Sequence, residues 1–175
     1  GHIAKLGYDM FVKLLDEEVK EVKGEKVEIK NDVRLEISLS GFISENYISD
    51  DEQRIVYYTR ISEISSQEEE KNILQSLRDG YGEPPQEIIN LCQLAYLRNI
   101  AGNFGVTKIR VNKYDMLVFL YKKEEIIDQR LSKYLSEFSG KLAFDSSVKI
   151  KFDCLCSVAE KVKRLIDFFE KALKE

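Results

Sequence analysis

Apolar residues recur at helical spacing through much of the first part of the chain and alternate with polar residues in the shorter segments that follow. The pattern predicts an amphipathic helix over residues 11–22, an alternating strand over 33–39, and helices over 50–61, 67–81 and 88–104. Beyond them it predicts hairpins over 107–121 and 142–152 and helices over 127–138 and 157–173.

This order of elements predicts an α+β fold. The N-terminal half would be helical with one strand, and the C-terminal half would be a small antiparallel sheet of two hairpins backed by helices. The pattern leaves open whether the early strand, residues 33–39, pairs with the hairpins.

Three predicted helix starts carry the Ser-x-x-Glu pattern of a capping box, in which the two side chains satisfy unpaired backbone N–H groups of the first turn. The pairs are Ser49 with Glu52, Ser66 with Glu69, and Ser157 with Glu160. Apolar residues at helical spacing follow each pair. The three serines are therefore predicted to be N-caps.

Residues 77–85 predict a sharp corner between two helices. Gly82 stands where helices commonly end on a residue with positive φ, and Pro84 cannot continue a helix. Pro85 suits the first turn of the next helix, because its missing N–H would have no partner there. The side chains expected at the surface of this corner are Arg78, Asp79, Tyr81 and Glu83.

Length and charge restrict the class of protein. A chain of 175 residues is long enough for a single domain with a substantial core. Its 27 basic and 31 acidic residues give a net charge of −4, the wrong sign for a protein that coats nucleic acid. We therefore expect protein partners. We also expect the chain to fold as a monomer, because its apolar stripes and helix caps are local.

The cysteines and the apolar runs indicate the compartment. Cys92, Cys154 and Cys156 are an odd number without disulfide or zinc spacing, which predicts reduced thiols in a cytoplasmic protein. No apolar run is long enough to span a bilayer, and no signal peptide precedes the first predicted helix. The chain begins Gly1-His2, which suggests either a segment of a longer protein or the remnant of a tag.

Residue types needed for catalysis are sparse. His2 is the single histidine and lies at the end of the chain, which disfavours a histidine-based acid, triad or metal site. Gly140-Lys141 lacks the other residues of a P-loop. The acidic runs 50–52 and 68–70 fall in first turns of helices, where the dipole favours negative charge. We predict no catalytic, cofactor or metal residue, and therefore no enzyme.

Two further groups have structural interpretations. A basic group on the last helix is diluted by acidic neighbours, which predicts a solvated face. Its members are Lys161, Lys163 and Arg164. Tyrosines at helical spacing are typical of a half-buried core. These are Tyr57, Tyr58, Tyr81 and Tyr96.

Asp79, Tyr81, Gly82 and Pro85 are followed by Leu-Cys-Gln-Leu-Ala-Tyr-Leu-Arg at residues 91–98 and by Phe104-Gly105-Val106. Upstream stand Gly7-Tyr8-Asp9 and a block containing Tyr47, Asp50, Arg54 and Arg60. Together these residues resemble the C-terminal domain of bacterial transcription-repair coupling factors, the Mfd family. The resemblance covers roughly residues 1–106 and departs from the family at Ser44, Ser49, Ser76 and Gly80.

The resemblance implies a fragment of a DNA translocase rather than a complete enzyme. Residues 1–175 would form a single non-catalytic regulatory domain of an ATP-dependent translocase, which contacts DNA through its translocase modules. The whole protein would remove stalled RNA polymerase and recruit nucleotide excision repair. In this family the domain docks on an N-terminal UvrB-like module and masks the surface that binds UvrA.

The resemblance also implies which residues dock. Asp79 matches the acidic position of the contact, and the interface is expected to include Ser76, Arg78, Tyr81 and Glu83. The family glutamate is Ser76 here, so the complementary charge is either weaker or supplied by another carboxylate. The candidates are Glu83, Glu69 and Glu70.

Two alternatives stay open. Asp79 lies at the C-terminal end of its helix, where the dipole disfavours negative charge, so a cation is expected beside it. That cation is either a residue of the UvrB-like module or a local arginine, namely Arg54, Arg60 or Arg78. The other classes of function are an unidentified enzyme and a nucleic-acid-binding accessory domain. The latter would use the first hairpin, through Lys108, Arg110, Lys122 and Lys123.

Overall fold

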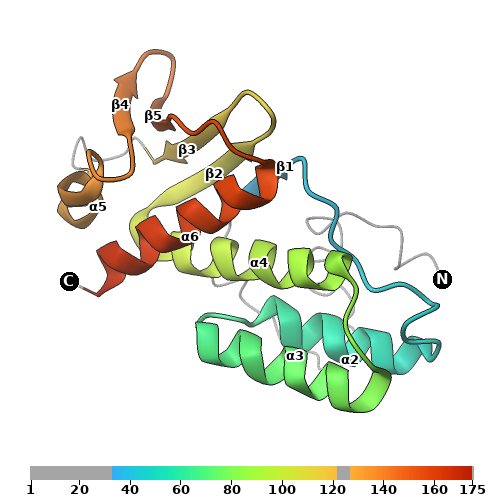
Figure 1. Ribbon diagram of the computed structural model, residues 1–175. Coiled ribbons are helices and arrows are strands. Elements are labelled where there is room, and N and C mark those ends of the chain that lie inside the picture. Colours follow the sequence, from blue (N-terminus) through green and yellow to red (C-terminus); the bar gives the residue numbers. More distant parts are fainter. Residues whose placement is uncertain (1–32, 122–126, 175) are drawn as a thin grey trace, which may run out of the picture. The chain divides into compact units, whose positions relative to one another are not determined.

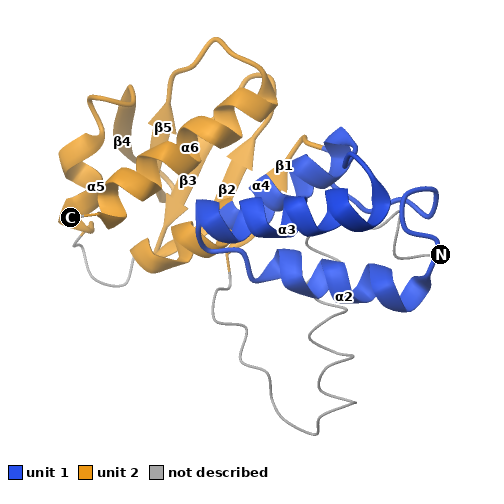
Figure 2. Ribbon diagram, turned by 60° about the horizontal axis from the view of Figure 1, so that its bottom comes forward, with its two compact units in different colours: residues 1–30, 40–96 blue, residues 31–39, 97–175 orange. Residues whose placement is uncertain are grey.

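The computed structural model describes residues 33–121 and 127–174 (Figure 1). The predicted helix over residues 11–22 and the predicted contacts of Lys122 and Lys123 lie outside these residues. The chain divides into two compact units, shown in different colours in Figure 2. Unit 1 comprises residues 1–30 and 40–96, and unit 2 comprises residues 31–39 and 97–175.

The described part of unit 1 is helical. Helices α2 (Asp51–Ser62) and α3 (Gln67–Tyr81) lie side by side, and α4 (Gln86–Ala101) begins after the corner. The residues of α4 within this unit, up to Tyr96, are mostly buried, as their apolar character predicts. Gly41 lies directly against this helix, and a Cβ there would stand 3.0 Å from the Leu91 backbone nitrogen. The absent side chain therefore allows the segment before α2 to pack on α4.

Two of the three predicted N-caps are confirmed. The Ser66 and Ser157 hydroxyls accept from the backbone N–H groups of Glu69 and Glu160, each at 3.2 Å. The third was wrong by one residue, because Asp50 rather than Ser49 caps α2, accepting from the Gln53 N–H at 3.1 Å.

Unit 2 is built on a five-stranded sheet in the order β1-β2-β3-β5-β4. Both predicted hairpins are confirmed, and the antiparallel pairing of β3 with β5 joins them. The early strand also belongs to this sheet, where β1 pairs in parallel with β2. The strands are β1 (Arg34–Ile37), β2 (Val106–Val111), β3 (Met116–Leu120), β4 (Gly140–Phe144) and β5 (Val148–Phe152).

Helix α6 (Val158–Leu173) covers one face of the sheet (Figures 1 and 2). Phe168 packs edge-on against Phe152 of β5, with ring centroids 5.1 Å apart. Phe169 stacks on Phe104 of the 3-10 helix η2 (Gly102–Phe104), with centroids 5.5 Å apart. Gly105 ends that segment with φ +70. These aromatic rings form the core between α6 and the sheet.

Lys161 corrects the expectation of a solvated basic face on this helix. Its side chain is buried, and its ammonium donates to the carbonyl oxygens of Asn112 and Lys113 at 2.9 and 2.8 Å. A buried ammonium must be hydrogen-bonded, and the turn between β2 and β3 supplies the acceptors. Lys161 thus ties the start of α6 to the first hairpin.

The helix predicted over residues 127–138 is shorter than expected. Helix α5 covers only Gln129–Tyr134, and turns continue to Ser139, whose φ is +57. Asp128 caps it and also pairs with Arg130 at 2.8 Å, which lowers the pKa of that carboxyl. Apolar residues continue at helical spacing through these turns, and for that reason the sequence pattern predicted a longer helix.

The cysteine prediction was wrong for two of the three residues. Cys154 and Cys156 form a disulfide, whereas Cys92 is a buried free thiol. The bend after β5 brings the two Cα atoms to 5.5 Å, within the range that a disulfide spans. Burial raises the pKa of the Cys92 thiol, as expected for a core cysteine.

The predicted α+β class is confirmed, with a mixed, mostly antiparallel sheet. None of the described helices is long and apolar enough to cross a membrane.

Candidate functional site

The predicted corner is present at the end of α3. The helix ends at Tyr81, and Gly82 follows with φ +87, a conformation that side chains rarely adopt. Helix α4 starts at Gln86, two residues before the start that the apolar spacing predicted, and the Pro85 carbonyl accepts from the N–H groups of Ile88 and Ile89. The backbone therefore reverses direction within residues 82–85.

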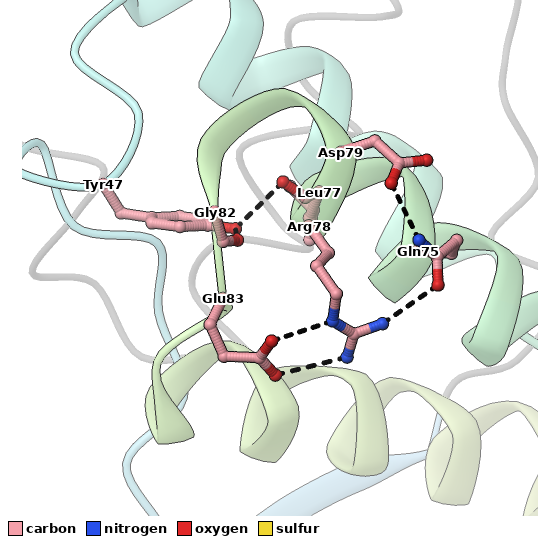
Figure 3. A network of polar contacts seen from close by, with 7 residues as sticks. All are labelled: Tyr47, Gln75, Leu77, Arg78, Asp79, Gly82 and Glu83. Atoms are coloured by element: carbon pink, nitrogen blue, oxygen red, sulfur yellow. Dashed lines mark hydrogen bonds and ion pairs between the residues drawn. The ribbon is translucent and has the colours of Figure 1, made fainter.

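Tyr47 holds this corner from the segment before α2 (Figure 3). Its hydroxyl lies 2.6 Å from the Gly82 carbonyl oxygen and 3.2 Å from that of Leu77. Burial, and secondarily the charge of Glu83, raise the pKa of Tyr47, so the hydroxyl stays protonated and donates. The end of α3 is thus fixed by a contact 35 residues away in sequence.

Tyr81 and Ser76 belong to a tyrosine cluster inside the corner. The Tyr81 ring lies 5.8 Å from that of Tyr47 and 6.0 Å from that of Tyr57, centroid to centroid. The Ser76 hydroxyl is 2.7 Å from the Tyr57 hydroxyl, and Arg60 lies over the Tyr57 ring at 5.0 Å. Tyr57, like Tyr58 and Tyr96, is buried, while Tyr81 stays 37% exposed and could contact a partner.

Arg78 and Glu83 pair across the corner. Two nitrogens of the guanidinium donate to the carboxylate, Nε at 2.9 Å and an Nη at 3.3 Å (Figure 3). The Arg78 hydrogen bond lowers the pKa of Glu83, and the Glu83 carboxylate raises the pKa of Arg78. Because both side chains are exposed, this pair orients the groups more than it stabilises the fold.

Asp79 has a different environment. Its Oδ1 accepts from the Gln75 side-chain nitrogen at 2.8 Å, one helical turn back (Figure 3). Within residues 33–121 and 127–174 it forms no ion pair. The three local arginines expected beside Asp79 have other partners. Arg54 pairs with Asp51, and Arg78 pairs with Glu83. Arg60 contacts the Ser76 hydroxyl and the Tyr57 ring. The exposed carboxylate at the end of α3 therefore has no ion-pair partner among the described residues, and the charge of the neighbouring Arg78 acts on it only from beyond ion-pair distance.

The other carboxylates considered for this site are engaged or distant. Glu83 is neutralised by Arg78. Glu69 bonds to the Ser65 N–H at 2.8 Å, and Glu70 accepts from Gln93 at 2.6 Å. Both belong to the first turn of α3, and nine residues of helix place Glu70 about 14 Å from Asp79 along the axis. Of the carboxylates considered for this site, Asp79 is thus the one that lies at the corner without an ion pair among the described residues.

Comparison with known protein families gives a match that includes this corner. The family model of the TRCF domain matches residues 37–131, more than half of the chain and all of this corner. The chain belongs to the TRCF domain family. Curated relatives support this membership. A transcription-repair-coupling factor of Borreliella burgdorferi is 32% identical over 127 residues, covering 73% of this chain and 11% of the relative.

A second TRCF-domain relative agrees with the first. The transcription-repair-coupling factor of Myxococcus xanthus is 40% identical over 100 residues, which cover 56% of this chain and 8% of the relative. The chain therefore spans about a tenth of the length of these two relatives.

The TRCF-domain fold is also found among solved structures. One match, titled "Crystal structure of C-terminal domain of transcription-repair coupling factor", has a TM-score of 0.71 and 19% identity. It covers 82% of this chain and 93% of that one. The shared fold therefore extends past residue 131, where the match to the TRCF family model ends.

Two residues that shape this part of the TRCF domain were missed from the sequence. Gln75 lies three and four residues before Arg78 and Asp79, so helical spacing alone could have placed it beside both. Tyr47 entered only as part of a resemblance. Its contact with Gly82 depends on the tertiary fold, and the local sequence carries no signal for it.

Proposed function

We propose that this chain is the single C-terminal regulatory domain of a transcription-repair coupling factor and that it restrains the whole protein. In the resting state the corner after α3 docks on the N-terminal UvrB-like module and masks the surface that binds UvrA. The domain has no catalytic role of its own. The translocase modules of the whole protein act on DNA and on stalled RNA polymerase.

Asp79 carries the proposal. It is an exposed carboxylate at the helix end where the dipole disfavours negative charge, and it forms no ion pair with any of the described residues. A basic residue of the UvrB-like module would compensate both effects. Glu83 contributes through its charge-neutral pair with Arg78, which frames Asp79 without competing for the same cation.

The shape of the corner supports docking through a preformed surface. Tyr47 and the positive φ of Gly82 fix the end of α3, so little conformational entropy is lost when Asp79 and Tyr81 meet a partner. Ser76 is committed to Tyr57 and therefore supports the surface instead of adding charge to it. In the proposed contact, Asp79 is the one residue that binds the partner through its charge.

Binding between the 175-residue chain and the isolated UvrB-like module tests the docking. Asp79→Arg replaces attraction by repulsion and is expected to weaken binding by about 2–5 kcal/mol if the contact is desolvated. Asp79→Asn should weaken it less, because Asn removes the charge without reversing it. Glu63→Arg is the matched control, since Glu63 is an exposed carboxylate at the C-terminal end of α2.

Equal affinity of wild type and Asp79→Arg, in chains with normal melting curves, would contradict docking through Asp79. Loss of binding in Glu63→Arg to the same extent would mean that net charge, not this corner, drives the association.

A further inference from the structure

All seven charged residues of the five strands lie on one face of the sheet in unit 2. Paired residues share a face, and one row across the sheet runs Arg34, Lys108, Phe119, Lys149. The next row runs Glu36, Arg110, Leu117, Lys151, Lys141. Six of the seven charges are basic and one is acidic, a net charge of +5 on strands of a chain whose total is −4.

We name this surface the basic sheet face. Its six cations are Arg34, Lys108, Arg110, Lys141, Lys149 and Lys151. It is opposite the core, because the intervening residues Leu35, Ile109, Val118 and Ile150 are buried. The Arg34 side chain is 73% exposed and that of Arg110 is 38% exposed, so the surface is accessible at both positions.

Carboxylates form ion pairs with three of the six cations of this face. Glu36 pairs with Arg110 at 3.1 Å and with Arg34 at 3.6 Å, and the Arg110 hydrogen bond lowers the pKa of Glu36. Asp145, from the turn before β5, pairs with Lys149 at 2.9 Å. The three remaining lysines have no carboxylate within ion-pair distance in the part of the chain that the structure describes. They are Lys108, Lys141 and Lys151.

An aromatic ring lies at the centre of these cations. The Lys108 ammonium is 4.2 Å from the centroid of the Phe119 ring, and Arg110 and Lys149 approach the same ring at 5.5 and 5.6 Å. Tyr121 is two residues further along and is 64% exposed. Aromatic rings on which bases stack, with cations beside them for the phosphates, are the combination that binds single-stranded nucleic acid.

We propose that the basic sheet face binds single-stranded DNA. A base stacks at Phe119 in place of the Lys108 ammonium, and Lys108 and the exposed Lys151 contact the phosphates on either side. A duplex keeps its bases stacked inside, so it could use only the charges. The two rows contain no neutral hydroxyl or amide side chain that would select a ribose through its 2′-OH, so we expect no preference for RNA over DNA. This inference does not rest on the proposed docking of Asp79, which lies in unit 1.

The test measures fluorescence anisotropy of a labelled oligothymidine of about 15 nucleotides with the 175-residue chain. The double variant Lys108→Glu/Lys151→Glu should bind at least about tenfold more weakly at about 50 mM salt. If both lysines contact phosphates, the slope of log affinity against log salt should fall in magnitude by roughly 1.4. The control Lys71→Glu/Lys163→Glu makes the same charge change at exposed lysines outside the sheet and should bind like wild type.

A second variant separates stacking from charge. Phe119→Leu keeps an apolar side chain but removes the ring, and it should weaken binding of the single strand about 5- to 150-fold. A duplex of the same length should lose much less. Melting curves establish that each variant is folded, and the lysine pair tests the proposal even if Phe119→Leu unfolds.

Four results would overturn the proposal. The first is equal loss of affinity in the lysine control, and the second is oligothymidine binding unchanged in Lys108→Glu/Lys151→Glu. Tighter binding of oligouridine would show that the ligand is RNA. Displacement of the oligonucleotide by a short polyglutamate peptide at equal charge concentration would show that the face recognises acidic protein.

Discussion

Asp79 occupies a position that the helix dipole disfavours, yet its only hydrogen-bond partner among the described residues is the neutral Gln75. Its neighbour Arg78 forms its ion pair with Glu83 and not with Asp79. An uncompensated charge at an ordered helix end contributes little to folding and can contribute much to binding. The consequence can be tested on the chain by itself.

Asp79→Asn should leave the free energy of unfolding of the isolated chain unchanged or raise it by about 0.3–1 kcal/mol, because it removes an unfavourable dipole interaction. Asn retains a carbonyl oxygen for Gln75. Urea denaturation measures the difference. A loss of more than about 1 kcal/mol would show that Asp79 serves the local fold.

Lys161 shows how far residue type alone can mislead. A lysine beside other charged residues on a helix predicts a solvated side chain, but this one is buried because carbonyls of a turn 48 and 49 residues away accept its protons. Sequence patterns near Lys161 contain no trace of that turn. The same holds for the Cys154–Cys156 disulfide, which depends on the bend after β5.

Lys161→Met keeps the aliphatic stem and leaves the two carbonyls without their donor. We expect it to lower the free energy of unfolding by about 1–3 kcal/mol. Lys163→Met, two residues further along and exposed, should change it by less than about 0.5 kcal/mol. Similar values for the two variants in urea denaturation would contradict the role assigned to the Lys161 ammonium.

At the scale of elements, local patterns predicted types and order well and partners poorly. The three described long helices of the first part, both hairpins and the last helix are where their periodicity placed them. The parallel pairing of β1 with β2 could not be predicted, because alternation identifies a strand without naming its neighbour. The predicted start of α2 was wrong by one residue because two neighbouring residues, Ser49 and Asp50, can both act as an N-cap.

Ser49 and Asp50 provide a matched pair for this boundary. Asp50 accepts from the Gln53 N–H, so Asp50→Ala should lower the free energy of unfolding by about 0.5–2 kcal/mol. Ser49→Ala should have little effect, since among the described residues the contact of Ser49 is made by its backbone carbonyl, which accepts from Arg54. Thermal or urea melts of both variants decide the case, and a larger loss for Ser49→Ala would mean that α2 begins one residue earlier.

At the scale of the whole molecule, the three cysteines give a direct check of the structure. Cys92 is buried with a raised thiol pKa, and the other two form a disulfide. A thiol reagent should therefore find no reactive thiol in the native chain, one after denaturation without reductant, and three after reduction. Three thiols in the denatured, unreduced chain would contradict the disulfide.

The net charge of the chain does not reveal how its charged residues are distributed over the surface. A net charge of −4 argued against nucleic acid, yet the strands carry six of the 27 basic residues on one face and a single acidic residue. The candidate docking corner lies in one compact unit and the basic sheet face in the other. Only the register of the sheet, which composition does not contain, brings these charges together.

The proposed restraint of the whole protein is tested by UvrA binding to that protein, with and without Asp79→Arg, in the absence of stalled polymerase. Losing about 3 kcal/mol of docking would shift a closed-to-open equilibrium by roughly 150-fold, enough to open a mostly closed protein. We expect Asp79→Arg to bind UvrA markedly more tightly than wild type, while Glu63→Arg binds like wild type. Unchanged UvrA binding by a folded Asp79→Arg protein would contradict the account.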